Sequence, residues 1–341
     1  MPSRGQAAIR GAKQQPGCAA ERGERDDRAG GHANAPDPAR GLRGEIGPGT
    51  MPAYRFCRTD DIALLTEALN VCYVVHFPDQ DPLSSGDFKR EIRELNVWSS
   101  SCMVVSADRG PIGVVTCAKR ERETLIHRIG VHPDSLRQGH ARHLLESLSQ
   151  KFAVLGPARM VAEVPDDLPT VRGLFEAVGY QAEQRFADFT LSKPLAPSAA
   201  TGGVSPASLD DLLRYEALDP SVSRSWERAL ETLQNRKDQI RGLAIASDTR
   251  VEACALFRDL PRYGRREIVG LGGTIQRGDG GADAGILLEI VVRVACQAGS
   301  LAVTIPRVSS EEISWDRLES MGFQRERTYT RYVGVPDSNT Q

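Results

Sequence analysis

Two kinds of apolar spacing alternate along the chain. Short runs rich in β-branched residues predict strands, and segments whose apolar residues recur every three or four positions predict helices. In the first half the pattern predicts strands at 54–58, 101–107, 112–118, 124–131, 160–164 and 186–191, and helices at 62–72, 88–95 and 170–178. A further helix follows the fourth strand, where Leu144, Leu145 and Leu148 recur at helical spacing. In the second half it predicts strands at 240–246, 251–257 and 267–270 and a helix at 226–233. This mixed order predicts an α+β fold in which a central sheet is flanked by helices.

The segment from Thr124 to Leu145 combines a strand, a polar loop and the start of a helix. The strand ends at Val131, and the loop contains Gly139. The first amides of a helix are unpaired and the helix dipole adds partial positive charge, so such a turn favours anions. Gly139 permits close approach of the backbone to a ligand, and Arg137 and Arg142 add positive charge. The sequence therefore predicts an anion-binding turn.

This segment resembles the acetyl-CoA-binding motif of the GNAT (GCN5-related) N-acetyltransferases, Val-x-Pro…[Gln/Arg]-x-x-Gly-x-[Gly/Ala]. Val131-His132-Pro133 and Gln138-Gly139-His140-Ala141 match in register, whereas Leu136 replaces the leading Gln or Arg. The resemblance implies that the loop holds the CoA pyrophosphate mainly through backbone amides, so the change at Leu136 need not abolish binding. It assigns acetyl-CoA as co-substrate and its contacts to Ile129, Gly130, Val131, Arg137, Gln138, Gly139, His140, Ala141 and Arg142.

Acetyl transfer requires a neutral amine, an oxyanion donor and a route for protonating the thiolate. His127 precedes Val131 by four positions, so strand alternation predicts that it points to the same side as Ile129 and Val131. Its ordinary pKa near 6.5 suits proton transfer at neutral pH, and the resemblance implies such a relay in some members. Glu123 is the second catalytic candidate, because other branches use a glutamate there. The alternative for His127 is a half-buried strand histidine without a role. The alternative for Glu123 is a solvated charge of the hairpin.

The residue that protonates the leaving thiolate is missing from the pattern. Many family members carry a tyrosine after a leucine in the helix before the Gly-aromatic turn, but this chain has Phe175 there. Either water or another residue then protonates the thiolate, and we expect Tyr180 to be a packing residue. The resemblance also places the acceptor pocket along residues 73–100. Asp79, Asp81 and Asp87 in that stretch are either attractors of a cationic amine or solvated loop acids.

The second half repeats the first at an offset of 143 residues. Leu144-Leu145-Glu146 matches Leu287-Leu288-Glu289, and Glu176–Glu183 matches Glu319–Glu326. Matches in the same order indicate a tandem duplication. We therefore predict an N-terminal GNAT domain at residues 53–195, a linker at 196–205 and a C-terminal GNAT-like domain at 206–336.

The two copies diverge at the predicted phosphate loop. The common offset places Ala282 at the position of Gly139, and Asp279 and Asp283 at those of Leu136 and His140. Two carboxylates compete with a pyrophosphate for the helix start, which predicts a degenerate second cofactor site. The alternative is a two-residue insertion, which lets Arg277-x-x-Gly280-x-Ala282 fit the family pattern.

Composition and charge narrow the possible partners, metal sites and location of the protein. The 341 residues carry a formal charge of −2 and contain no run of 18 apolar residues, which argues against nucleic-acid and membrane partners. The seven cysteines form no CxxC pair and no residue pairing suggests a metal site, so we expect buried thiols and a cytoplasmic protein. His132, His140 and His143 are expected at the surface. Residues 1–52 are predicted to be a disordered tail or to precede the true start at Met51.

The combined interpretation is an acetyl-CoA-dependent N-acetyltransferase that acts on a primary amine of a small molecule or a protein. The alternative is a non-catalytic acyl-CoA-binding or regulatory tandem GNAT protein, which the changes at Leu136 and Phe175 suggest. A third interpretation is an O-acyltransferase or another acyltransferase on the same scaffold. The acceptor and the oligomeric state stay open at this point.

Overall fold

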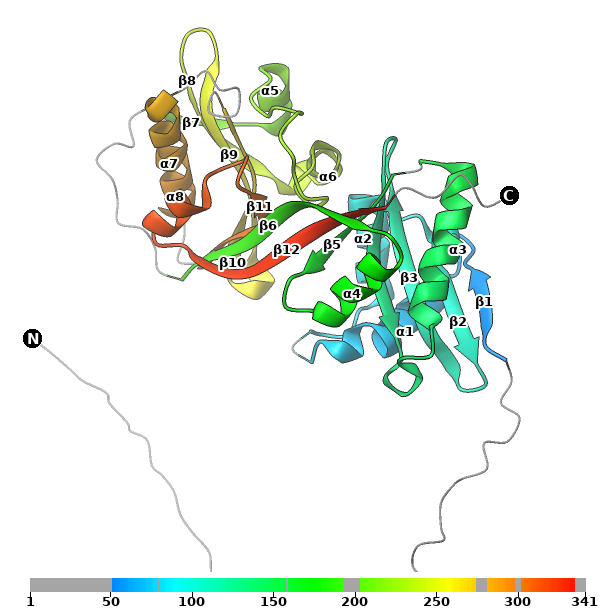
Figure 1. Ribbon diagram of the computed structural model, residues 1–341. Helices are drawn as coiled ribbons and strands as arrows, with labels where there is room; N and C mark the ends of the chain where they lie inside the picture. Colours follow the sequence, from blue (N-terminus) through cyan, green and yellow to red (C-terminus); the bar gives the residue numbers. More distant parts are fainter. Residues whose placement is uncertain are drawn as a thin grey trace, which may run out of the picture. The chain divides into compact units, whose positions relative to one another are not determined.

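The computed structural model describes residues 51–192 without 79 and 158, and residues 203–273, 281–297 and 302–334. These described residues belong to one compact unit (Figure 1). Its first half contains β1 (Ala53–Phe56), α1 (Ile62–Cys72), the 3-10 turn η1 (Val74–His76), α2 (Ser85–Leu95), β2 (Met103–Ala107), β3 (Gly110–Lys119), β4 (Thr124–Val131), α3 (His140–Leu155), β5 (Met160–Pro165), α4 (Pro169–Ala177) and β6 (Gln181–Leu191). The predicted order of elements in this half is confirmed.

The second half repeats this order with shorter helices at its beginning. It contains β7 (Val204–Ala207), α5 (Leu209–Arg214), α6 (Leu230–Asn235), β8 (Arg241–Ala246), β9 (Val251–Leu260), β10 (Arg265–Gly273), α7 (Gly281–Gln297), β11 (Ala302–Ser309), α8 (Trp315–Ser320) and β12 (Gln324–Gly334). The predicted helix at 226–233 is wrong at its start, because the helix begins only at Leu230. Helix α2 begins three residues earlier than predicted, because Ser84 and Asp87 form a capping box there.

All twelve strands form one sheet, in the order β1-β2-β3-β4-β5-β12-β6-β11-β10-β9-β8-β7. The last strand of each half lies in the other half's part of the sheet. β12 pairs antiparallel with β5 and with β6, and β6 pairs antiparallel with β11. Figure 1 shows green β6 and red β12 side by side between the halves.

The predicted strand at 186–191 therefore does not lie beside β5, the strand that precedes it in the first half. β12 takes the place beside β5. Because β6 and β12 are equivalent strands of a repeat, each is able to fill the other's position, and their mutual pairing removes two open sheet edges. Neither half is a complete sheet by itself.

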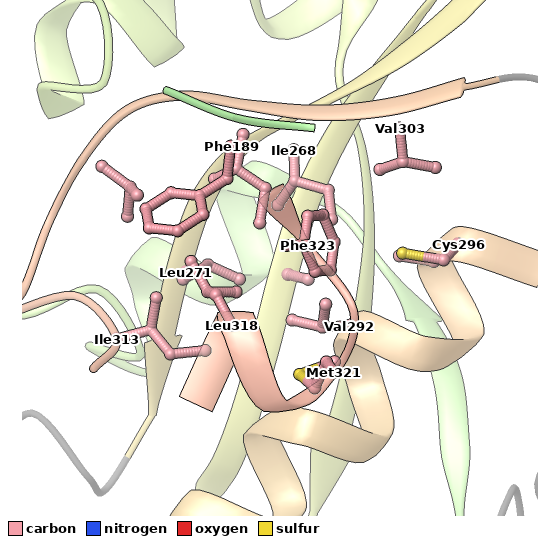
Figure 2. Close-up of a cluster of buried hydrophobic side chains, with 14 of the residues drawn as sticks. Phe189, Ile268, Leu271, Val292, Cys296, Val303, Ile313, Leu318, Met321 and Phe323 are labelled. Atoms are coloured by element: carbon pink, nitrogen blue, oxygen red, sulfur yellow. The ribbon is translucent and has the colours of Figure 1, made fainter. Parts of the chain in front are cut away.

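Four apolar clusters cover the two faces of this sheet. In the first half, α1 and α2 pack on one face and α3 and α4 on the other. In the second half, α5 and α6 cover one face, and α7 and α8 cover the other. Figure 2 shows this last cluster, where Phe189 of β6 packs with Phe323 and Leu318 from the other half. The six cysteines in the described residues are buried free thiols, as predicted for those among them that lie in apolar segments.

Candidate functional site

Strand β4 separates from β5 soon after it begins. The two strands pair only at Thr124–Met160 and Leu125–Val161. β4 continues to Val131 as a partner of β3. From Ile126 onward, its edge toward β5 therefore has no strand partner among the described residues. This open edge presents backbone donors and acceptors to a ligand.

A β-bulge interrupts β4 at the candidate histidine. Arg128 pairs with Thr116 and Ile126 with Cys117, which leaves His127 as the extra residue. A bulge breaks the alternation of side chains and re-aims the bulged residue. His127 and Arg128 both reach Glu91 on α2, whereas Ile129 packs with the α3 cluster. The prediction that His127 shares a side with Ile129 is therefore wrong.

The His127 imidazole is enclosed beside an ion pair. Its side chain is 8% exposed, and Nε2 lies 3.5 Å from Oε2 of Glu91. Arg128 holds the Glu91 carboxylate with two hydrogen bonds of 2.5 and 2.8 Å. Within the described part of the chain, His127 Nε2 has no hydrogen-bond partner. Glu91, at 3.5 Å, is the nearest charged group to this buried nitrogen.

Electrostatics keep this imidazole neutral at neutral pH. Burial, and then the charge of Arg128, lower the pKa of His127 below its ordinary 6.5, and Glu91 offsets part of that shift. Burial raises the pKa of the Glu91 carboxyl, but His127 and Arg128 outweigh it and bring the pKa to about 2. An unprotonated imidazole beside an ionised carboxylate has the form that a general base requires.

Helix α1 ends directly against the open part of β4. A Cβ added to Gly130 would lie 2.2 Å from the carbonyl oxygen of Cys72. Next to it, Nε2 of His76 donates to the carbonyl of Val131 at 2.8 Å. Only glycine permits this approach of two backbones.

Gly130→Ala is expected to destabilise the protein by about 1–3 kcal/mol, because backbone rather than a flexible side chain blocks the added methyl group. Urea denaturation followed by circular dichroism measures this loss. Gly173→Ala in α4 is the matched control, since a Cβ there meets nothing within 4 Å. We expect it to be neutral or slightly stabilising. Equal stabilities of the two variants would contradict the close approach.

The predicted anion-binding turn has the geometry that its sequence indicated. Gly139 has a φ of +86° and stands immediately before α3, and Arg137 has a φ of +63°. The first bond of α3 runs from the amide of His143 to the carbonyl of Gly139, so the amides before His143 point out of the helix start. The side chains of Arg137, Gln138 and Arg142 are exposed around that start.

His140 differs from the prediction that it lies at the surface. It is 5% exposed, and its Nδ1 is hydrogen bonded to the Tyr54 hydroxyl at 2.6 Å. The first turn of α3 packs on β1 there, and His143 also contacts the Tyr54 ring, at 4.1 Å between centroids, although His143 is exposed. His132 is half-buried.

Several acidic candidates lie away from the bulge. Glu123 precedes β4 at its paired end, where Nε of Arg159 donates to it at 3.3 Å. Asp87 caps α2 and pairs with Arg90. Asp81 is exposed, and Asp79 is outside the described residues. The structure thus does not bring Glu123 together with His127.

Glu91 is the residue that the sequence reasoning missed. It stands three positions after Phe88 and four before Leu95, on the apolar stripe of α2. A carboxylate on that stripe was the available signal, because buried acids are rarely without a partner.

The aromatic residues near α4 belong to the core. Phe175 is 1% exposed and packs edge-on against Tyr180 at 5.2 Å between centroids. The Tyr180 hydroxyl faces Sδ of Met160 at 3.8 Å, which agrees with a packing role. Tyr332 stacks on Phe175 from the other side, and its hydroxyl bonds to Arg172 and Glu176. None of these rings supplies a free hydroxyl in place of the missing tyrosine.

The second half has the same strand separation, β-bulge and close glycine contact as the first. β10 and β11 pair only from Arg265–Ala302 to Glu267–Thr304, and Val269 is the bulged residue. A Cβ on Gly272 would lie 2.3 Å from the carbonyl oxygen of Ala217, as for Gly130 and Cys72 in the first half. Val269, however, is apolar and buried in the cluster with α5 and α6.

A buried ion pair fills the separation between β10 and β11. Nη1 of Arg228 donates to the carbonyls of Ile268 at 2.6 Å and of Pro306 at 3.3 Å, one on each strand. The same guanidinium makes two bonds of 2.8 Å to Glu312, and both side chains are at most 1% exposed. Protein atoms therefore occupy the backbone groups that the first half leaves open.

The second phosphate loop lies largely outside the described residues, which exclude 274–280 and hence Arg277, Asp279 and Gly280. Helix α7 begins at Gly281, the start that the two-residue insertion requires. The helix bodies nevertheless keep the offset of 143, since Leu145 and Leu288 are both fully buried. The difference between the halves thus rests on Val269 and Arg228 rather than on this loop.

Among the described residues, no helix combines the length and apolar character required to cross a bilayer. No group of three or more His, Cys, Asp or Glu side chains converges there as a metal site would.

Known proteins resemble this chain in part of its sequence and in its fold. Residues 62–180 match the model of the acetyltransferase (GNAT) family. A GCN5-related N-acetyltransferase from Sphaerobacter thermophilus is 17% identical, with a TM-score of 0.60 over 83% of this chain and 95% of its own. A putative acetyltransferase from Pyrococcus horikoshii is 15% identical, with a TM-score of 0.56 over 87% and 93%. A tandem GNAT protein from the clavulanic acid biosynthesis pathway, solved without AcCoA, is 12% identical, with a TM-score of 0.56 over 84% and 99%.

The TM-scores establish a shared fold, and the family match covers the segment that contains the open edge of β4 and the turn before α3. Residues 62–180 are therefore similar to the acetyltransferase (GNAT) family, and the two halves together have the fold of a tandem GNAT protein.

Proposed function

We propose that the first half transfers an acetyl group from acetyl-CoA to a primary amine. The observation that carries this proposal is the neutral His127 at the bulge of β4, beside an open strand edge that leads to the start of α3. The proposed base and the open edge thus both lie on β4, and the proposed anion-binding turn lies between β4 and α3. This order is what a thioester substrate with a phosphate-bearing end requires.

The described residues fit such a substrate. The outward amides of α3 and the exposed side chains of Arg137 and Arg142 suit the pyrophosphate. The backbone groups on the open edge of β4, from Ile126 to Gly130, suit the amide-containing arm and supply donors for the thioester carbonyl. The family match supports the use of an acyl-CoA.

The chemistry assigns one proton acceptor to the protein. The amine nitrogen attacks the carbonyl carbon, the carbon–sulfur bond breaks, and the amine proton passes to the imidazole of His127. Solvent protonates the thiolate, since Phe175 cannot donate a proton. The products are an amide and free CoA.

We further propose one acetyl-CoA per chain. Arg228 and Glu312 fill the separation between β10 and β11, and Val269 replaces a titratable residue at the bulge. These features support a structural role for the second half.

Calorimetry on the full chain is expected to give one acetyl-CoA site, and a panel of primary amines is expected to give free thiol and acetylated product. Arg137→Ala with Arg142→Ala should weaken binding about tenfold at low salt, since each charge contributes roughly 0.3–1 kcal/mol at a helix start and salt screens it. Arg122→Ala, an exposed charge near the other end of β4, is the control. Absence of acetyl-CoA binding would overturn the proposal, and two equal sites would overturn its stoichiometry.

The buried phenyl ring of Phe175 favours one competing function, acyl-CoA binding without transfer. That function predicts the same single binding site but no thiol release above background with any amine. Calorimetry and the thiol assay on the same sample therefore separate the two.

A further inference from the structure

The end of helix α2 is bound by residues of the second half. Helix α6 lies beside α2 (Figure 1). The indole Nε1 of Trp226, between α5 and α6, donates to the carbonyl of Leu95 at 2.8 Å. Nδ2 of Asn235, the last residue of α6, donates to the carbonyl of Glu94 at 3.2 Å. The last carbonyls of a helix have no partner inside it, so these two donors cap α2 from the other half.

A buried ion pair between the two halves strengthens this cap. Nε of Arg236 donates to Oε2 of Glu94 at 2.8 Å, and both side chains are at most 10% exposed. Nε2 of Gln239 donates to the other oxygen of the same carboxylate at 3.0 Å. A negative charge in the last turn of a helix is unfavourable beside the helix dipole, and the Arg236 guanidinium offsets it. The end of α2 therefore depends on the second half for both its carbonyls and its charge.

The capped end of α2 is one turn away from the candidate site. Glu91 precedes Glu94 by three positions and Leu95 by four, so the three residues lie on one side of the helix. Glu91 accepts two bonds of 2.5 and 2.8 Å from Arg128 and lies 3.5 Å from Nε2 of His127. Direct contacts therefore lead from the second half through α2 to the bulge of β4.

We infer that the second half positions the base of the first, because it fixes the end of α2 and thereby holds Glu91 against His127. This inference rests on the proposed acetyl transfer. Asn235, Arg236 and Gln239 are then positioning residues, since they touch α2 rather than the reacting atoms. The second half, whose own strand separation is filled by protein atoms, thus takes part in the reaction of the first.

Asn235→Ala combined with Gln239→Ala tests this inference in the full chain. The two substitutions remove two donors to α2 from exposed positions, so the midpoint of thermal unfolding should change little. Trp226 and Arg236 still hold the helix end, so the displacement of Glu91 should be small. Because a misplacement of about 1 Å costs about 10²-fold in rate, we expect kcat for amine acetylation to fall by about 3- to 10-fold. KM for acetyl-CoA should stay unchanged.

Gln234→Ala combined with Lys237→Ala is the matched control. Both side chains are exposed in the same segment, and Lys237 pairs with Asp210 of the second half. We expect this control to keep the kcat of the wild type.

Two readouts distinguish the positioning of His127 from a general loss of structure. In a His127→Ala background, the Asn235→Ala and Gln239→Ala substitutions should change kcat less than about twofold, because the base is already absent. NMR titration of the His127 imidazole should give a lower pKa in the double variant than in the wild type, because a displaced Glu91 stabilises the imidazolium less.

A wild-type kcat with an unchanged His127 pKa in the double variant would overturn the inference and leave acetyl transfer standing. An equal loss of kcat in the His127→Ala background would overturn it as well. Absence of transfer to every amine by the wild type would instead count against the proposed function. The imidazole titration would then still decide whether the second half holds Glu91 against His127, since it requires no turnover.

Discussion

Replacing His127 by alanine is expected to lower kcat for amine acetylation by about 10²- to 10⁴-fold, the usual contribution of a positioned general base. The imidazole is neutral, and its Nε2 has no hydrogen-bond partner within the described residues. The side chain makes no part of the anion-binding turn, so the Kd for acetyl-CoA should stay within a few-fold. Steady-state kinetics and calorimetry on the full chain measure the two quantities. His143→Ala, which removes an exposed histidine of α3, is the control.

The same residue has a pH signature. Because the pKa of His127 is lowered from 6.5, its imidazole takes up a proton only at a lower pH than an exposed histidine. A base is inactivated by protonation, so its contribution should be complete at pH 7 and disappear as the pH falls through that lowered value. NMR titration of the imidazole signals, with His127→Ala for assignment, reports this pKa. Glu91→Gln should lower it further, because the carboxylate stabilises the imidazolium. A His127 pKa at or above 6.5, or a kcat in His127→Ala within tenfold of the wild type, would remove His127 from the mechanism.

Arg228→Ala is expected to cost about 3–5 kcal/mol of stability, because it leaves the fully buried carboxylate of Glu312 without its partner. The carbonyls of Ile268 and Pro306 lose a donor at the same time. Arg224 lies 3.8 Å from Glu312 and compensates only in part. Urea denaturation followed by circular dichroism measures the change. Since β6 and β12 join both halves in one sheet, we expect both to lose stability together.

A second variant distinguishes the contribution of the ion pair to stability from that of the packing around it. Arg228→Met with Glu312→Leu replaces both charges by apolar groups and should recover most of the loss. Arg214→Ala is the surface control: its ion pair with Asp211 is exposed and should contribute at most about 1 kcal/mol. A loss in Arg228→Ala no larger than in this control would show that the buried pair does not stabilise the separation of β10 and β11.

Features that depend on neighbouring residues could be predicted from the sequence, and features that depend on distant residues could not. The order of strands and helices, the turn before α3 and the tandem repeat were all readable, because they depend on residues close together in the chain. The position of Glu91 beside His127 was not. It requires both the packing of α2 on β4 and the bulge at His127, which reverses the side that simple alternation predicts.

The repeat in the sequence also does not show which closing strand, β6 or β12, lies beside β5. Two equivalent closing strands satisfy the same pairing pattern in either half, so local patterning does not distinguish a closed first half from an exchange of β6 with β12. Trp226 and Arg228 were equally unreadable, since Trp226 packs in the first half and Arg228 fills the separation of β10 from β11.

The chain's local patterns thus determined the α+β element order, the duplication and the glycine turn before α3, because hydrophobic period and helix-start chemistry are short-range properties. The tertiary structure alone decided which strand closes which half, which way His127 points and which half keeps an open β4-type edge. Each of these depends on contacts between residues far apart in the sequence, whose free energies no local pattern contains.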